Sequence, residues 1–83
     1  MSLTVVLQET ALRALAGIRS EDKEAFATIR WALLALADDP RPDQAVAWGG
    51  SGIYRLHLPG GRILYEVDDD AATVYVINVA LTA

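Results

Sequence analysis

Hydrophobic residues recur along the chain with two different spacings, and each spacing predicts a type of secondary structure. The stretch LTVVL, residues 3–7, is almost wholly apolar and rich in β-branched residues, which is typical of a short strand. From Thr10 the apolar residues follow helical spacing as far as Gly17 and Ile18, where the glycine is expected to end the helix. The pattern therefore predicts a strand followed by a short helix.

A second helical pattern follows, with apolar residues three or four positions apart at Phe26, Ile29, Leu33 and Leu36. Ser20 is the expected N-cap of this helix, because its hydroxyl can accept a hydrogen bond from a free amide of the first turn. The helix is expected to end at Asp38-Asp39-Pro40, since proline cannot continue a helix.

The C-terminal half has the alternating pattern of strands. Three strands are predicted at about residues 52–58, 62–68 and 73–80, with PGG and DDDAA as the connecting turns. The element order is then β-α-α-β-β-β. It predicts a single α+β domain over residues 1–83, an antiparallel sheet with a two-helix hairpin packed on one face.

Alternation also assigns side chains to the two faces of this sheet. If the helices cover the more apolar face, the core is expected to hold Phe26, Ile29, Leu33, Tyr54, Leu56 and Tyr65. The opposite face then gathers the polar residues of the two neighbouring strands, which are Arg55, His57, Arg62 and Glu66. An open sheet face that carries cationic side chains is the candidate for chemistry.

Composition limits what such a face can do. The chain has no cysteine and one histidine, so no metal site of the thiolate or histidine-cluster type is expected, and no cofactor is predicted. With 11 acidic against 7 basic side chains the net charge is -4, which argues against a protein that coats nucleic acid through bulk charge. Any contact with nucleic acid must therefore be local.

Hydropathy and chain termini give expectations about location and assembly. No apolar run approaches the roughly 20 residues of a membrane span, and the N-terminus lacks the features of a signal peptide. We therefore expect a cytoplasmic protein with no membrane partner. Because 53% of the residues are hydrophobic in a small domain, some must stay exposed, and we expect a homodimer or a complex with a partner protein.

Several motifs of the C-terminal half occur in a fixed order. A helix ends in DDPRP, a Tyr-Arg-Leu strand begins at residue 54, GRILYEV occupies residues 61–67, and an acidic turn leads into a final apolar strand. This ordered set resembles the RelE/ParE superfamily of toxin-antitoxin toxins, and the leading strand and helix pair match as well. The resemblance implies a RelE-like fold and a small toxin that a cognate antitoxin holds inactive. The antitoxin is expected to bind as a short helix or as a strand added at residues 3–7.

For the RelE branch, the resemblance implies a toxin that enters the ribosome and cleaves mRNA, with the RNA 2′-hydroxyl as the nucleophile. Such cleavage needs groups that move protons and groups that stabilise the charged phosphorane. Arg62 stands at the position of the central catalytic arginine of the family. Arg55 and His57 stand at positions where basic residues are usual. Guanidinium groups match phosphate oxygens, and His57 can move protons near neutral pH.

The chain also departs from the family pattern. Thr82 occupies the position of a second family arginine, the tyrosine that follows it is absent, and QAVAWGG replaces a Lys-rich segment. We therefore expect reduced cleavage that takes place only on the ribosome. Two alternatives stay open: a ParE-like toxin that binds a protein such as DNA gyrase, or a degenerate homologue that only binds or dimerises.

The candidate residues also have purely structural interpretations. Arg55 and Arg62 can be solvated side chains that pair with Glu66 or with the acidic turn, because exposed ion pairs are common and contribute little. His57 can equally have no catalytic role.

The remaining distinctive residues leave similar alternatives open. The acidic run at residues 68–70 lacks the spacing of a calcium loop and is expected to be a solvated turn. Trp31 lies off the helical stripe and Trp48 lies in a loop, so each is either a partner contact or ordinary packing.

Overall fold

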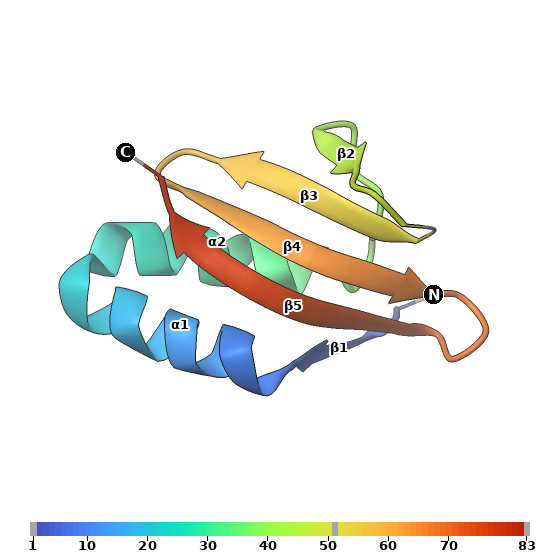
Figure 1. Ribbon diagram of the computed structural model, residues 1–83, viewed down its shortest axis with the longest axis horizontal. Coiled ribbons are helices and arrows are strands. Elements are labelled where there is room, and N and C mark those ends of the chain that lie inside the picture. The colour runs from blue at the N-terminus through green and yellow to red at the C-terminus, as the bar shows by residue number, and fades with distance from the viewer. Residues whose placement is uncertain (1, 51, 83) are drawn as a thin grey trace.

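The computed structural model describes residues 2–50 and 52–82 and has the predicted order of elements, with one addition (Figure 1). The elements are β1 Thr4–Leu7, α1 Glu9–Glu21, α2 Lys23–Ala35, β2 Ala45–Ala47, β3 Ile53–Leu58, β4 Gly61–Asp68 and β5 Thr73–Leu81. The addition is β2, which the sequence analysis left in the connector. Three residues are too few to show an alternating pattern, and pairing with β3 is what makes this segment a strand.

The five strands form one sheet in the order β1-β5-β4-β3-β2. The pairs β3–β4 and β4–β5 are antiparallel, as predicted, and so is β2–β3, whereas β1 runs parallel to β5. The sheet is therefore mixed. Strand β1 leads directly into α1 and not into a hairpin, so no tight turn sets its direction relative to a neighbouring strand.

The boundary between the two helices differs from the prediction. Helix α1 continues past Gly17 to Glu21, and Ser20 lies inside it. The N-cap of α2 is Asp22, whose carboxylate accepts a hydrogen bond from the amide of Ala25 at 3.0 Å. Gly17 does not end α1 because it lies at an exposed position in the helix, where glycine costs stability without breaking the hydrogen-bonding pattern.

Both helices lie on one face of the sheet, and the core fills the space between the two layers (Figure 1). Of the predicted core residues, Ile29, Leu33, Leu56 and Tyr65 are buried, while Phe26 and Tyr54 are half-buried and pack against the core. The assignment of the two sheet faces is thus confirmed.

Helix α2 packs very closely on the start of β4. A Cβ added to Gly61 would lie 2.9 Å from the Ile29 Cδ1 atom, and the residue before it, Gly60, has a φ of +81° in the β3–β4 turn. Gly60 therefore allows a left-handed turn, and Gly61 allows the close packing of α2 on β4.

Among the described residues, no helix is both long and apolar enough to cross a membrane.

Candidate functional site

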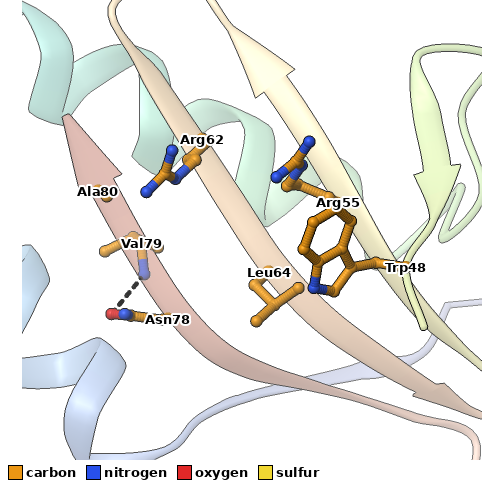
Figure 2. A pocket seen from close by; sticks show the side chains of 7 residues that line it. All are labelled: Trp48, Arg55, Arg62, Leu64, Asn78, Val79 and Ala80. Atoms are coloured by element: carbon orange, nitrogen blue, oxygen red, sulfur yellow. Dashed lines mark hydrogen bonds between the residues drawn. The ribbon is translucent and has the colours of Figure 1, made fainter. Parts of the chain in front are cut away.

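The face of the sheet opposite the helices carries a hollow that contains two arginines (Figure 2). Arg55 comes from β3 and Arg62 from β4. In the strand pairing Arg55 lies opposite Leu64, which is two residues beyond Arg62 on the same face. The arginines are therefore diagonal neighbours, a relation that places Cα atoms roughly 7–8 Å apart. The hollow has a volume of about 190 Å³, and its lining is Trp48, Arg55, Arg62, Leu64, Asn78, Val79 and Ala80.

Trp48 closes one side of this hollow and contacts Arg55. The guanidinium carbon of Arg55 lies 3.9 Å from the centroid of the Trp48 ring, which is a cation–π contact. The indole itself is 46% exposed. Trp48, which the sequence left as either a partner contact or packing, thus packs on a charged side chain of the candidate site and remains accessible.

Backbone hydrogen bonds hold the loop that carries Trp48 against β3 and β4. The amide of Trp48 donates to the carbonyl of Ile53 at 2.9 Å, and the amide of Val67 donates to the carbonyl of Gly52 at 2.8 Å. Gly52 has a φ of +80°, and a Cβ there would lie 3.1 Å from the Val67 carbonyl oxygen. A glycine is required at this position, and it lets the loop turn back beside the sheet.

The two arginines lack the ion pairs that a purely structural interpretation would give them. In the part of the chain that the structure describes, the ion pairs are Arg13–Glu9 and Arg41–Asp69, and neither Arg55 nor Arg62 takes part in one. The Nε atom of Arg55 is buried and has no hydrogen-bond partner among these residues. A buried donor without a partner costs about 1–3 kcal/mol, and two like charges share the hollow. Such a site favours an anion.

His57 stands apart from this hollow. It is exposed and lies opposite Arg62 in the strand pairing, so the two residues share the open face. The hollow to which His57 contributes is a different one of about 400 Å³, where α2 provides Ala32 and its C-cap residue Leu36 also forms part of the lining. The structure therefore brings Arg55 and Arg62 together and places His57 beside them.

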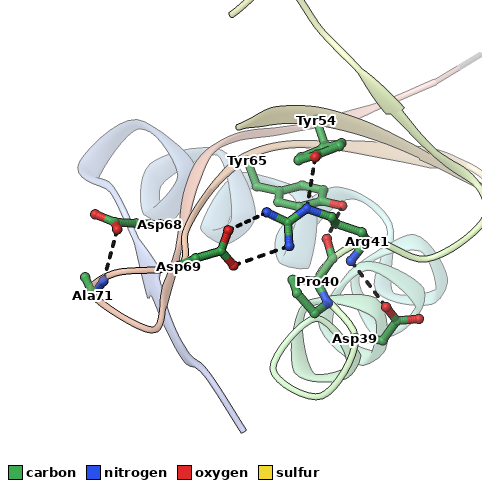
Figure 3. Close-up of polar contacts among 8 residues, drawn as sticks. All are labelled: Asp39, Pro40, Arg41, Tyr54, Tyr65, Asp68, Asp69 and Ala71. Carbon is green, nitrogen blue, oxygen red and sulfur yellow. Dashed lines mark hydrogen bonds and ion pairs between the residues drawn. The ribbon is translucent and has the colours of Figure 1, made fainter. Parts of the chain in front are cut away.

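A second polar cluster, which the sequence analysis missed, lies at the far end of the sheet (Figure 3). The guanidinium of Arg41 donates to both carboxylate oxygens of Asp69, at 3.4 and 2.8 Å, and its Nε donates to the Tyr54 hydroxyl at 2.9 Å. The hydrogen bonds to Asp69 and then to Tyr54 raise the pKa of Arg41 above its ordinary value. Arg41 thereby ties the α2–β2 connector to the β4–β5 turn.

Tyr65 completes this cluster from inside the core. Its hydroxyl donates to the carbonyl of Pro40 at 2.7 Å, and its ring stacks on that of Tyr54 with centroids 5.8 Å apart. Burial, with smaller effects of Tyr54 and Asp39, raises the pKa of Tyr65 to about 12. The DDPRP motif was the only sequence signal for this cluster, and a motif of this kind does not predict which residues Arg41 contacts.

The acidic turn has a structural role of its own. The carboxylate of Asp68 accepts a hydrogen bond from the amide of Ala71 at 3.0 Å, while Asp69 pairs with Arg41. The turn is thus more than a solvated run of charge. Within residues 2–50 and 52–82, no group of three or more His, Cys, Asp or Glu side chains is placed to hold a metal ion.

Large apolar side chains remain exposed on the helices. Trp31 is 76% exposed on α2, close to the exposed Leu34, and Leu12 is exposed on α1. The two α2 residues line a shallow hollow of about 340 Å³. Exposed apolar groups of this kind mark surfaces that a partner protein can cover.

Comparison with known proteins gives one family match and several structural matches. Residues 5–82 match the family model described as ParE toxin of type II toxin-antitoxin system, parDE. No curated protein sequence matches the chain.

Three solved structures illustrate the similarity of fold. The archaeal RelE-RelB complex from Pyrococcus horikoshii has a TM-score of 0.82 at 18% identity, covering 98% of this chain and 96% of that chain. The isolated E. coli RelE toxin has a TM-score of 0.79 at 24% identity, with coverage of 99% and 86%. The toxin-antitoxin complex RelBE2 from Mycobacterium tuberculosis has a TM-score of 0.78 at 23% identity, with coverage of 99% and 100%. Identities this low show a shared fold and nothing finer.

Proposed function

Because the chain belongs to the ParE toxin family, within the RelE/ParE superfamily of type II toxin-antitoxin systems, we propose that a cognate antitoxin holds it inactive and that it acts on RNA when released. The antitoxin is the partner that the fold relatives suggest, since two of the three solved structures named above are toxin-antitoxin complexes. The exposed apolar residues of the helices, Leu12, Trp31 and Leu34, offer a surface that such a partner would cover.

The proposed activity is ribosome-dependent cleavage of mRNA through the open face of the sheet. The observation that carries it is the pair Arg55 and Arg62, which share one hollow and form no ion pair with the carboxylates that the structure describes. In this proposal Arg62 stabilises the charge of the phosphorane and Arg55 holds the scissile phosphate. His57, opposite Arg62, supplies or accepts the proton.

Charge and geometry both predict a slow reaction. A protein with a net charge of -4 gains little from counterion release, so free RNA is a poor substrate and the ribosome has to present the mRNA. His57 lies beside the arginine hollow and not in its lining, and Thr82 provides no second transition-state cation. The loss of one such contact typically costs on the order of a hundredfold in rate.

A second candidate is a toxin that binds a protein such as DNA gyrase and cleaves nothing. The observation that favours it is the lining of the arginine hollow, where the two guanidinium groups are the only ionisable side chains among the described residues. An arginine stays protonated at neutral pH and cannot act as a general base. A site of this composition can bind an anionic group without any bond being broken.

Induced expression separates the two candidates. We expect growth arrest that co-expression of the antitoxin encoded beside the toxin relieves, and primer extension on a reporter transcript should show cuts at the ribosomal A site. Arg62→Ala and Arg55→Ala should remove both arrest and cuts. Arg30→Ala should change neither, because Arg30 is an exposed residue of α2, the helix that lies on the other face of the sheet.

Two other results would reject cleavage. Arrest without cuts, together with inhibition of purified gyrase, identifies the protein-binding toxin. A folded and abundant protein that causes no arrest shows that the chain has lost toxin activity.

A further inference from the structure

We propose that Trp48 is a positioning residue, whose indole holds the guanidinium of Arg55 beside Arg62 so that the two cations form a preorganised clamp for one phosphate group. This inference deepens the proposed function and rests on it only for the claim that the phosphate belongs to RNA. The clamp itself follows from the contacts around the arginine hollow (Figure 2).

The cation–π contact between Trp48 and Arg55 is much closer than the two others found among the described residues. The guanidinium carbon of Arg55 lies 3.9 Å from the ring centroid, whereas Arg19 lies 5.8 Å from the ring of Phe26 and Arg41 lies 5.5 Å from that of Tyr54. A cation directly over a tryptophan ring has the most favourable form of cation–π contact. Arg55 therefore lies directly over the ring of Trp48, whereas Arg19 and Arg41 make only distant contacts with their aromatic rings.

The backbone position of Trp48 does not depend on Arg55. Ala47, the last residue of β2, pairs with Tyr54 of β3, and the amide of Trp48 donates to the carbonyl of Ile53. Gly52, with its positive φ, brings the other end of the loop back onto Val67. Backbone contacts on both sides of the loop thus place the backbone of Trp48 beside β3, and the long side chain of Arg55 lies over its indole ring.

Arg55 needs this contact because, in the part of the chain that the structure describes, no other side chain orders its head group. No carboxylate among the described residues pairs with it, its Nε has no hydrogen-bond partner there, and Arg62 repels it. A free arginine of this kind would occupy many rotamers, and a ligand would have to order it on binding. Stacking uses the face of the guanidinium and leaves the N–H donors of its two terminal nitrogens available to a phosphate, while Nε stays buried.

Phosphate binding by variants of Trp48 tests the inference. The probe is inorganic phosphate, titrated into the protein at low salt, and a chloride titration at the same ionic strength is the control. The readout is the NMR signals of the arginine Nε–H groups. In the wild type we expect the Arg55 signal to be displaced by the ring current of Trp48, and phosphate should shift the signals of Arg55 and Arg62 together.

Three variants define the role of the ring. Trp48→Leu keeps an apolar cover but removes the aromatic face, so the ring-current displacement should vanish and phosphate affinity should fall about fivefold, equivalent to about 1 kcal/mol. Trp48→Phe should restore most of the affinity. Trp31→Phe, at the exposed tryptophan of α2, should bind phosphate like the wild type.

Two outcomes would overturn the inference. In the first, phosphate shifts neither arginine signal of the wild-type protein. In the second, the Trp48→Leu variant is folded and binds phosphate with wild-type affinity. Growth assays keep it separate from the proposed function. Arrest that requires Arg55 and Arg62 but is equally strong in Trp48→Leu rejects the positioning role and leaves the toxin function standing. Absence of arrest in every variant, with the phosphate results as expected, rejects the RNA function and leaves the clamp.

Discussion

Replacement of Tyr65 by alanine is the most severe single perturbation that the fold predicts. Tyr65 is fully buried, its ring stacks on Tyr54, and its hydroxyl donates to the carbonyl of Pro40 at 2.7 Å. Loss of a buried aromatic ring costs about 3–5 kcal/mol, because the surroundings close only part of the cavity. A domain of this size has a free energy of unfolding near the low end of the roughly 5–15 kcal/mol range, so Tyr65→Ala should be close to unfolded.

Phenylalanine at the same position separates the ring from the hydroxyl. Tyr65→Phe keeps the stack on Tyr54 but leaves the Pro40 carbonyl without its donor, so we expect a loss of about 1–2 kcal/mol. Tyr54→Phe is the matched control, because the Tyr54 hydroxyl accepts an exposed hydrogen bond from Arg41 and its removal should cost less than about 1 kcal/mol.

Urea unfolding followed by circular dichroism measures all three variants. The order of destabilisation should be Tyr65→Ala, then Tyr65→Phe, then Tyr54→Phe, with unchanged dependence on urea concentration. A loss below about 1 kcal/mol for Tyr65→Ala would mean that its ring is not in the core and that the two sheet faces are assigned the wrong way round.

Other predictions concern pH, packing, capping and the Arg41–Asp69 pair. Burial raises the pKa of Tyr65 from 10.0 to about 12, so the folded state favours the neutral phenol more than the unfolded state does. The resulting contribution to the free energy of unfolding is complete below pH 10 and is lost as the pH rises from 10 to about 12. Unfolding at alkaline pH should show this loss, and Tyr65→Phe should lack it. Gly61→Ala should cost about 1–3 kcal/mol in urea unfolding, because the new Cβ would lie 2.9 Å from a side-chain carbon of α2; a neutral effect would contradict the close packing. Asp22→Ala should cost about 1 kcal/mol through loss of the α2 N-cap, whereas Ser20→Ala should be nearly neutral; the reverse order would restore Ser20 as the cap. A double-mutant cycle on Arg41 and Asp69 should give a coupling below about 1 kcal/mol that decreases with salt, since the two side chains are 41% and 69% exposed; a coupling that does not respond to salt would indicate a desolvated pair.

The order of the elements and the two faces of the sheet could be predicted from the sequence because both depend on local patterns. Successive side chains of a strand point to opposite faces whatever the strand pairs with, so alternation alone separates Arg55 and Arg62 from Leu56 and Tyr65. The helical stripe through Ile29 and Leu33 follows in the same way from the period of the helix.

The helix boundary was harder to predict because two cap candidates lie close together. Ser20 and Asp22 both have side chains that can cap a helix, and the sequence around Gly17 contains a plausible stop signal. Asp22 caps α2 because α1 continues through an exposed Gly17, and this choice depends on how the two helices pack on the sheet.

Contacts between distant segments were decided only by the tertiary structure. Arg41 meets Asp69, 28 positions along the chain, because the α2–β2 connector and the β4–β5 turn reach the same end of the sheet. Trp48 lies on Arg55 because β2 pairs with β3, and the three residues of β2 have no pattern of their own. Sequence periodicity could place the arginines on an open face, but only the folded chain shows which aromatic ring holds one of them, since that contact is made by pairing and loop closure and not by local spacing.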